Sequence, residues 1–155
     1  MTYLVDGEDR VVSWTALPTP DVGAPKPIVV SDEDSVLLTY RIAGELFAVV
    51  QFLQFAAYFF GEPNDEAISG HPLADRGLEP YGCYVVEDSS WIRSLERQNA
   101  MHPMHDPARY RKVRHFIVAF HDSTFECVAA AAEVTEGERG EVWLQLKETL
   151  RGGVA

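Results

Sequence analysis

The sequence has only two cysteines among its 155 residues, and neither stands in a metal-ligand spacing. Cys83 and Cys127 each lie inside an apolar run that has the composition of a strand. A free cysteine behaves as a small hydrophobic residue, so we expect two buried, reduced thiols, as in a protein of a reducing compartment. A disulfide between them requires that their strands be neighbours.

Long hydrophobic runs are also absent. The longest apolar stretch, residues 46–60, is interrupted by Gln51 and Gln54 and is shorter than the roughly 20 residues that a membrane helix needs. The first residues carry acids where a secretory signal carries basic residues followed by an apolar run. These two features predict a cytoplasmic protein without a membrane partner.

Basic residues are scarce. The sequence has 13 Lys and Arg and 24 Asp and Glu, which gives a formal net charge of −11. A field of this sign repels phosphate backbones, so nucleic acid is not an expected partner. It attracts a basic protein and raises the rate of association. The charge has a simpler explanation as well, because a net charge far from zero keeps a protein soluble.

Common catalytic and cofactor-binding signatures are missing. The chain contains no Gly-x-Ser-x-Gly, Gly-x-Gly-x-x-Gly or Cys-x-x-Cys string. These strings mark nucleophile elbows, dinucleotide-binding turns and paired metal ligands. We therefore expect no cofactor.

The composition is that of a folded protein, with 46% hydrophobic and 24% charged residues. A chain of this length buries roughly 70% of its unfolded surface as one domain. We expect a single globular domain over residues 1–155, in which an N-terminal arm and a proline-rich loop (1–27) precede the main body (28–155). The loop is marked by Pro18, Pro20, Gly23, Pro25 and Pro27.

Alternating patterns predict strands in the first half of the chain. Residues 10–15 suit an edge strand, and 36–42 suit a half-buried strand that ends at the turn 43–45. Residues 46–60 are ambiguous, because a helix would gather the polar side chains on one face. Their many aromatic and β-branched residues favour one long bulged strand or two short ones.

The second half mixes helices and strands. We expect a strand at 81–87, a helix at about 89–101 and a short helix that begins after Asp106-Pro107. Strands at 114–121 and 124–135 follow, and a C-terminal helix ends the chain, although its Val142, Leu144 and Leu146 also alternate as in a strand. The predicted fold class is α+β, a mostly antiparallel sheet with two or three helices packed on it. Trp91 and Trp143 are expected in the core, whereas Trp14 is less constrained.

The last two strands predict a hairpin with a tight turn at Asp122-Ser123. This pairing sets Phe120 opposite Phe125 and Val118 opposite Cys127, which makes one face uniformly apolar. The other face carries His115 and His121 on one strand and Glu126 on its partner, so its turn end is polar.

Two segments hold the candidate catalytic residues. The loop 61–80 is long for a compact domain, and loops of this kind are often functional. The polar side chains of this loop are suited to an acid/base group. At the hairpin end, an imidazole beside carboxylates is suited to general-base chemistry. The simpler explanation is that these side chains satisfy turn backbone. The candidates are Asp65, Glu66 and His71 in the loop and His121, Asp122 and Glu126 in the hairpin.

A metal site is a weaker hypothesis. His102, His105 and Asp106 lie close together between the two predicted helices, and zinc, nickel or copper accepts such ligands when a further one comes from elsewhere. Asp106, however, already has a role as a helix cap.

The segments Gly-Glu-Pro-Asn-Asp-Glu (61–66), Gly-His-Pro-Leu (70–73) and His-Asp-Ser-Thr-Phe-Glu-Cys (121–127) resemble a group of small, uncharacterised bacterial proteins that has no named family. The resemblance covers roughly the middle and later half of the chain and implies no catalytic residues. It points to the same loop and hairpin end.

The sequence thus favours a protein-binding or regulatory module that presents acidic loops, such as an immunity-type inhibitor of a basic toxin. The rival hypothesis is a small hydrolase or metal-dependent enzyme that uses the loop histidines and carboxylates. The two differ in whether His71 and His121 meet Asp65 or Glu66 in one pocket.

Overall fold

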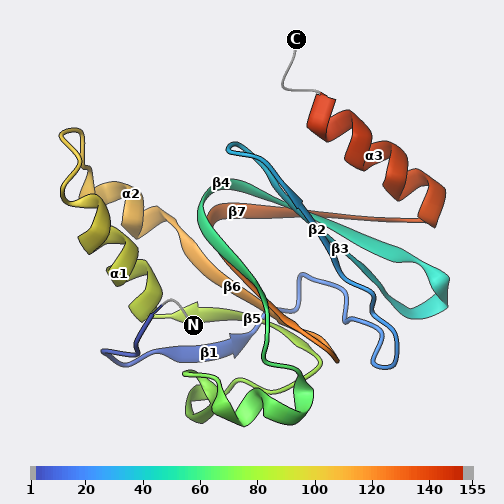
Figure 1. The fold of residues 1–155 in the computed structure, drawn as a ribbon, viewed down its shortest axis with the longest axis horizontal. Helices are drawn as coiled ribbons and strands as arrows, with labels where there is room; N and C mark the ends of the chain where they lie inside the picture. The colour runs from blue at the N-terminus through green and yellow to red at the C-terminus, as the bar shows by residue number, and fades with distance from the viewer. Residues whose placement is uncertain (1–2, 152–155) are drawn as a thin grey trace.

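The protein forms one seven-stranded antiparallel sheet (Figure 1), seen in a computed structural model that describes residues 3–151. The strands are β1 (Arg10–Ser13), β2 (Ile28–Ser31), β3 (Val36–Arg41), β4 (Phe47–Gly61), β5 (Gly82–Glu87), β6 (Arg114–Ala119) and β7 (Thr124–Gly137). Their order in the sheet is β1-β5-β6-β7-β4-β3-β2. The expected antiparallel α+β architecture is confirmed.

Three α-helices and three short 3-10 helices complete the part of the chain that is described. They are α1 (Ser90–Asn99), α2 (Pro107–Lys112) and α3 (Arg139–Arg151), with η1 (Ala43–Glu45), η2 (Asp65–Gly70) and η3 (Ala74–Arg76). The three α-helices agree with the expected two or three. The 3-10 helices η2 and η3 lie in the loop 61–80, whose composition did not indicate any helix. Within residues 3–151, no helix has the length and apolar character that crossing a bilayer demands.

Two long strands give the sheet its shape. β4 has 15 residues and β7 has 14, and their pairing shifts register between Phe55 and Ala57, next to Gln54 with a positive φ of 51°. A bulge of this kind bends and twists a strand. The strand prediction for 46–60 is confirmed, in its form of one long bulged strand instead of two short ones.

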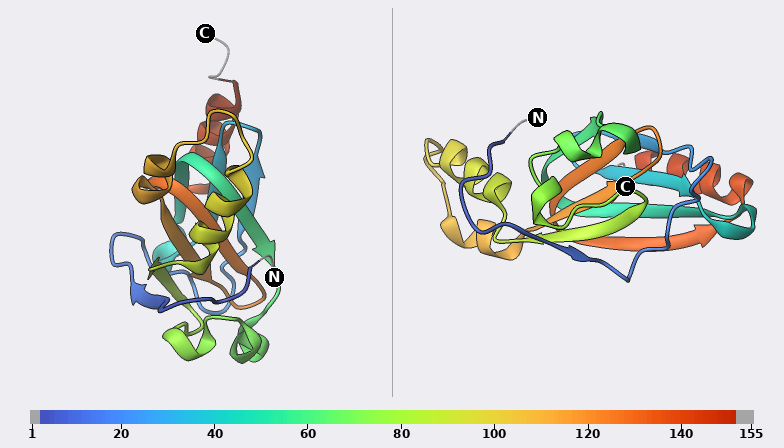
Figure 2. Two further views of the ribbon diagram at one scale, coloured as in Figure 1. Left: turned by 90° about the vertical axis from the view of Figure 1, so that its left-hand side faces the viewer. Right: turned by 90° about the horizontal axis from the view of Figure 1, so that it is seen from below.

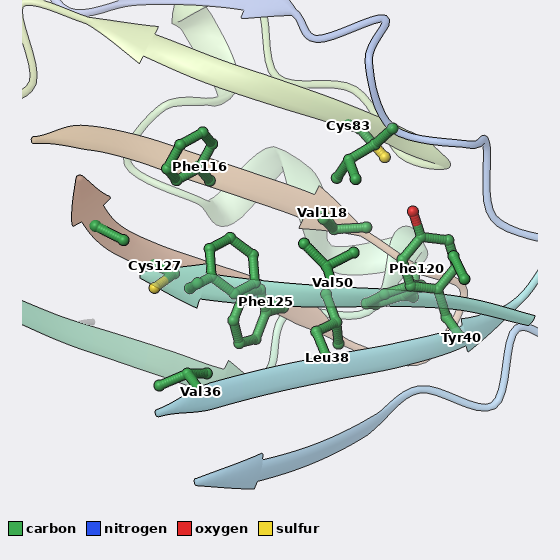
Figure 3. Packing of buried hydrophobic residues seen from close by; sticks show 14 of the residues in the cluster. Val36, Leu38, Tyr40, Val50, Cys83, Phe116, Val118, Phe120, Phe125 and Cys127 are labelled. Carbon is green, nitrogen blue, oxygen red and sulfur yellow. The ribbon is translucent and has the colours of Figure 1, made fainter. Parts of the chain in front are cut away.

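Because the sheet coils over on itself, side chains of β3 and β4 face those of β5 and β6 across the main core (Figure 3). The ring of Phe52 in β4 lies 5.6 Å from that of Phe116 in β6 and 5.3 Å from that of Phe125 in β7. Tyr40 of β3 approaches Phe120 edge-on at 5.4 Å. Such tilted aromatic pairs add to the hydrophobic stabilisation of the buried area.

The hairpin β6–β7 differs from its prediction in register. Val118 pairs with Phe125 and Ala119 with Thr124, and the Phe120 N–H donates to the Ser123 carbonyl at 2.8 Å. The tight turn is therefore His121-Asp122, and the predicted pairing around Asp122-Ser123 is wrong by two residues. A slip of two keeps every side chain on its own face, so the hydrophobic pattern could not detect it.

Helices cover the opposite face of the sheet at its two ends (Figure 2). At one end α1, whose N-cap is Ser89, buries Trp91 as expected, and α2 starts at the predicted cap Asp106. At the other end α3 places Val142 and Leu146 on the sheet. These two residues are one helical turn apart, which leaves Trp143 half exposed, so its expected core position is wrong.

The N-terminal arm is fixed to the sheet. β1 pairs with β5 as the predicted edge strand, and the ring of Trp14 lies 4.7 Å from that of Phe116. In the proline-rich loop, the Pro18 carbonyl accepts a hydrogen bond from the Tyr40 hydroxyl at 2.8 Å, and the Pro25 carbonyl accepts one from the Arg41 N–H at 2.7 Å.

Both cysteines are expected to resist alkylation in the folded protein. Cys83 and Cys127 are free and buried, and β6 separates their strands. Burial raises the pKa of Cys83 to about 11 and also raises the pKa of Cys127, so little reactive thiolate forms near neutral pH. Iodoacetamide followed by mass spectrometry should find two labels only after denaturation. Rapid labelling of the native protein at pH 7 would contradict this expectation.

Candidate functional site

A buried carboxylate, Glu126 of β7, collects three hydrogen-bond donors from distant parts of the chain. The Tyr3 hydroxyl donates to its Oε1 at 2.7 Å, and His115 Nε2 of β6 lies 2.9 Å from the same oxygen. His71 Nε2, from the residue that ends η2, lies 3.0 Å from Oε2. The carboxylate is 1% exposed. We call Glu126, Tyr3, His71 and His115 the Glu126 cluster.

The sheet register explains why these groups meet. Glu126 pairs with Ile117, and Val128 pairs with His115, so His115 and Glu126 are diagonal neighbours on one face of the hairpin. The loop before β5 brings His71 over this face, and the N-terminal arm brings Tyr3. The ring of Tyr3 stacks on Trp91 of α1 at 5.4 Å, which fixes its direction.

The outer nitrogens of both histidines are also occupied. The Leu73 N–H donates to His71 Nδ1 at 3.0 Å, so the ring proton of neutral His71 lies on Nε2 and points at Glu126. His115 Nδ1 lies 2.8 Å from the hydroxyl of Ser89, the residue that caps α1. Every polar atom of the two rings therefore has a partner.

Charge in this cluster is stabilised by its donors. Burial opposes ionisation of Glu126, but the hydrogen bonds from His115 and His71 outweigh it and lower its pKa to about 2. Burial, together with the charge and hydrogen bond of Glu126, raises the pKa of Tyr3. The cluster is thus an ionised carboxylate held by three donors, and it has no free group for acid/base chemistry.

A second group lies at the surface, where the hairpin turn meets the loop 61–80. We call Asp65, Tyr81, His121 and Asp122 the hairpin-tip cluster. The Tyr81 hydroxyl donates to Asp65 Oδ2, and the Asp65 N–H donates to the His121 carbonyl at 2.9 Å. His121 Nδ1 lies 3.0 Å from Asp122 Oδ1 and 3.9 Å from Asp65 Oδ1. Glu66, the remaining loop candidate, is exposed, and its backbone N–H donates to Asp65 Oδ1.

The hydrogen bond from Tyr81 lowers the pKa of Asp65, and the same bond raises the pKa of Tyr81. The negative charge of Asp65 raises the pKa of His121, and the charge and hydrogen bond of Asp122 raise it further. His121 therefore carries more positive charge at neutral pH than a free histidine does.

Replacing Asp65 with asparagine is expected to lower the pKa of His121, because the largest cause of its elevation is removed. An NMR titration of the imidazole protons measures this shift directly. The Asp122→Asn variant should also lower this pKa, because it removes the second carboxylate charge beside the ring. If the His121 pKa is unchanged in Asp65→Asn, the carboxylate does not act on this ring.

A groove of about 490 Å³ opens beside the hairpin-tip cluster. We call it the loop groove. Its lining includes the carboxylates of Glu62 and Asp122 and the amide of Asn64, and His71 lies against it while its side chain points to Glu126. His121 and Asp65 are not among its lining residues. The structure therefore brings His121 to Asp65 and His71 to Glu126, and it does not bring the two histidines together.

The residues of the metal hypothesis lie between α1 and α2 and have other partners. His105 Nδ1 lies 2.8 Å from Asn99 Oδ1, His102 Nδ1 accepts from the Met104 N–H, and Asp106 accepts from the Ala108 N–H as a helix cap. Among the residues described, no three His, Cys, Asp or Glu side chains are grouped as metal ligands.

Sequence reasoning missed the buried half of the site. Tyr3, Ser89 and His115 hold or orient the Glu126 cluster, yet only His115 carried a signal, since it shares a strand face with Glu126. No periodicity connects Tyr3 or His71 with Glu126, because those contacts depend on where the arm and the loop are docked.

Comparison with known proteins adds no relative, since neither the protein-family models nor the curated proteins and solved structures include a significant match to this chain.

Proposed function

We propose that this protein is an acidic binding module whose loop groove receives a basic side chain of a protein partner. The observation that carries the proposal is the groove itself, in which two carboxylates line a concave site on a chain of net charge −11. Lys and Arg place a cation on a long stem, which suits a groove with an acidic rim.

The charge of the surrounding segment supports this function. Residues 61–80 contain five acids and one base, Arg76, and the groove residue Asp122 adds a sixth acid. Glu62 and Asp122 are both exposed, so they keep their charge in the free protein without a desolvation cost. Complementary charge of this kind speeds association with a basic partner.

The groove also offers apolar contact. Phe59, Pro63 and Ala67 lie between its polar residues. Aromatic residues are typical anchors of protein interfaces, and Phe59 supplies one in this groove. An immunity-type inhibitor of a basic toxin is the kind of module that such a surface fits.

The hydrolase alternative has less support in the geometry. Its candidates His71 and Glu126 are hydrogen-bonded to each other, and both side chains are buried away from any substrate. His121 and Asp65 remain at the surface, but they do not line the loop groove. A general base needs direct reach to the substrate. The buried pair lacks it, and the surface pair lies outside the lining of the groove.

The test compares two variants that remove the same charge. Glu62→Gln/Asp122→Asn neutralises the loop groove, and Glu33→Gln/Asp34→Asn neutralises two exposed acids of the β2–β3 turn. Immobilised wild-type protein and the turn variant are expected to retain the same stoichiometric basic protein from native-cell lysate at low salt, and the groove variant should lose it. Equal retention by all three, or no protein retained at any salt concentration, would count against the proposal.

A further inference from the structure

A second cavity, of about 350 Å³, lies between α3 and the strands β2, β3 and β4. We call it the α3 cavity. It shares no lining residue with the loop groove, and α3 lies at the opposite end of the sheet from α1 and α2 (Figures 1 and 2). Its apolar walls are Ile28, Phe47, Val142, Trp143 and Leu146. A concave site with mostly apolar walls and few polar groups is typical of a small-molecule pocket.

The charge of this cavity is opposite to that of the molecule. Three of the 13 basic residues line it, namely Lys26, Arg41 and Arg139, and one acid does, Glu45. Glu45 Oε1 lies 3.7 Å from Arg41 and is almost fully exposed, so it compensates only one of the cations. The cavity is therefore a local cationic site on an acidic protein, and it favours an anion.

Two buried donors in this cavity have no partner. Among the side chains that the structure describes, the buried polar atoms without a hydrogen bond are Thr39 Oγ1 and Arg41 Nε, and both residues line the α3 cavity. Thr39 is 2% exposed. Both residues lie on the face of β3 that also carries Leu37 toward α3, two positions apart along the strand.

Buried donors without partners are rare, because each costs the free energy of its lost hydration. Thr39 and Arg41 both line one cationic cavity, and a hydroxyl and a guanidinium N–H are suited to the two oxygens of a carboxylate. The apolar walls would then hold the body of the same ligand.

We propose that the α3 cavity binds a small organic acid, a single carboxylate on an aliphatic or aromatic body. Thr39 and the guanidinium of Arg41 donate to the carboxylate, and Lys26 and Arg139 supply attraction at the mouth. The body packs between Phe47, Trp143 and Leu146. The volume is near the lower end of the range of ligand pockets, roughly 300–1,000 Å³, which suits a medium-chain or aryl acid.

Calorimetric titration with octanoate, 1-octanol and octyltrimethylammonium separates the charge requirement from simple apolar binding. Octanoate is expected to bind saturably at one site, and the neutral and cationic probes of equal chain length should bind far more weakly. 1-Naphthoate tests the aromatic alternative in the same way. Equal binding of all the probes, or saturable binding of neither acid, would overturn the proposal.

The Thr39→Val variant provides the sharpest control, because it removes the hydroxyl and keeps the shape. The hydroxyl has no partner in the free protein, so urea unfolding should show unchanged or greater stability. Octanoate affinity should fall by about tenfold, the effect of one hydrogen bond to a charged group. Lys112→Gln, which removes an exposed cation of α2, should leave the affinity unchanged. Unchanged affinity in Thr39→Val would contradict the assignment of this donor and of the site.

Discussion

Replacing Glu126 with glutamine is expected to lower the free energy of unfolding by about 3 kcal/mol at pH 7. The carboxylate accepts hydrogen bonds from Tyr3, His71 and His115 in a site without solvent contact. A glutamine amide keeps one acceptor oxygen but turns its NH₂ group toward groups that also donate. Breaking a buried charged network from one side typically costs about 3–5 kcal/mol, because the remaining partners stay buried and unsatisfied.

The loss should depend on pH. The pKa of Glu126 is lowered from 4.5 to about 2 in the folded protein, and each pKa unit corresponds to about 1.4 kcal/mol. A lowered pKa in the folded state gives stability that is fully present above the unfolded pKa and is lost as pH falls toward the folded one. The wild-type advantage over Glu126→Gln should therefore shrink between pH 4.5 and pH 2.

Urea unfolding followed by circular dichroism at a series of pH values measures both effects. Glu133→Gln is the matched control, since Glu133 lies on the same strand and is exposed. Its free energy of unfolding should stay within about 0.5 kcal/mol of the wild type. A deficit of Glu126→Gln that keeps its full size at the lowest pH at which the protein folds would show that the carboxylate charge is not what the donors stabilise.

The Glu126 cluster explains why the loop 61–80 is ordered. Long loops with little regular structure have few backbone hydrogen bonds of their own, so side-chain anchors must hold them. His71 is such an anchor, and Thr124 adds another, since its hydroxyl donates to the Pro63 carbonyl at 2.9 Å. The loop groove lies between these two points. A site held in this way is formed before its partner arrives, which reduces the entropy cost of binding.

Local patterns were enough to predict most of the secondary structure. The alternation at 36–42 and the pair Asp106-Pro107 each depend on neighbouring residues, and both reappear in the structure. The β6–β7 register was not accessible in this way, because pairings that differ by two residues present identical faces. The exposure of Trp143 was also inaccessible, since it depends on how α3 rotates onto the sheet.

The site shows a similar division. The pairing of polar side chains on one hairpin face was visible in the sequence, because His115 and Glu126 share that face in both the predicted and the observed register. The partners of Glu126 from the arm and the loop were not visible, since sequence separations of 123 and 55 residues carry no periodic signal. The α3 cavity was not predictable from the sequence either, because its basic residues come from three separate segments of the chain.

The core prediction with the largest expected effect concerns Phe125. Its ring is fully buried against Phe52 and Tyr58, and Phe125→Ala should cost about 3–5 kcal/mol in the free energy of unfolding through lost burial and the cavity that remains. Phe60 stands directly opposite on β4 and is 40% exposed, so Phe60→Ala removes the same atoms and should cost far less. If chemical denaturation shows the same loss of unfolding free energy in Phe125→Ala and Phe60→Ala, the coiled sheet does not close over Phe125.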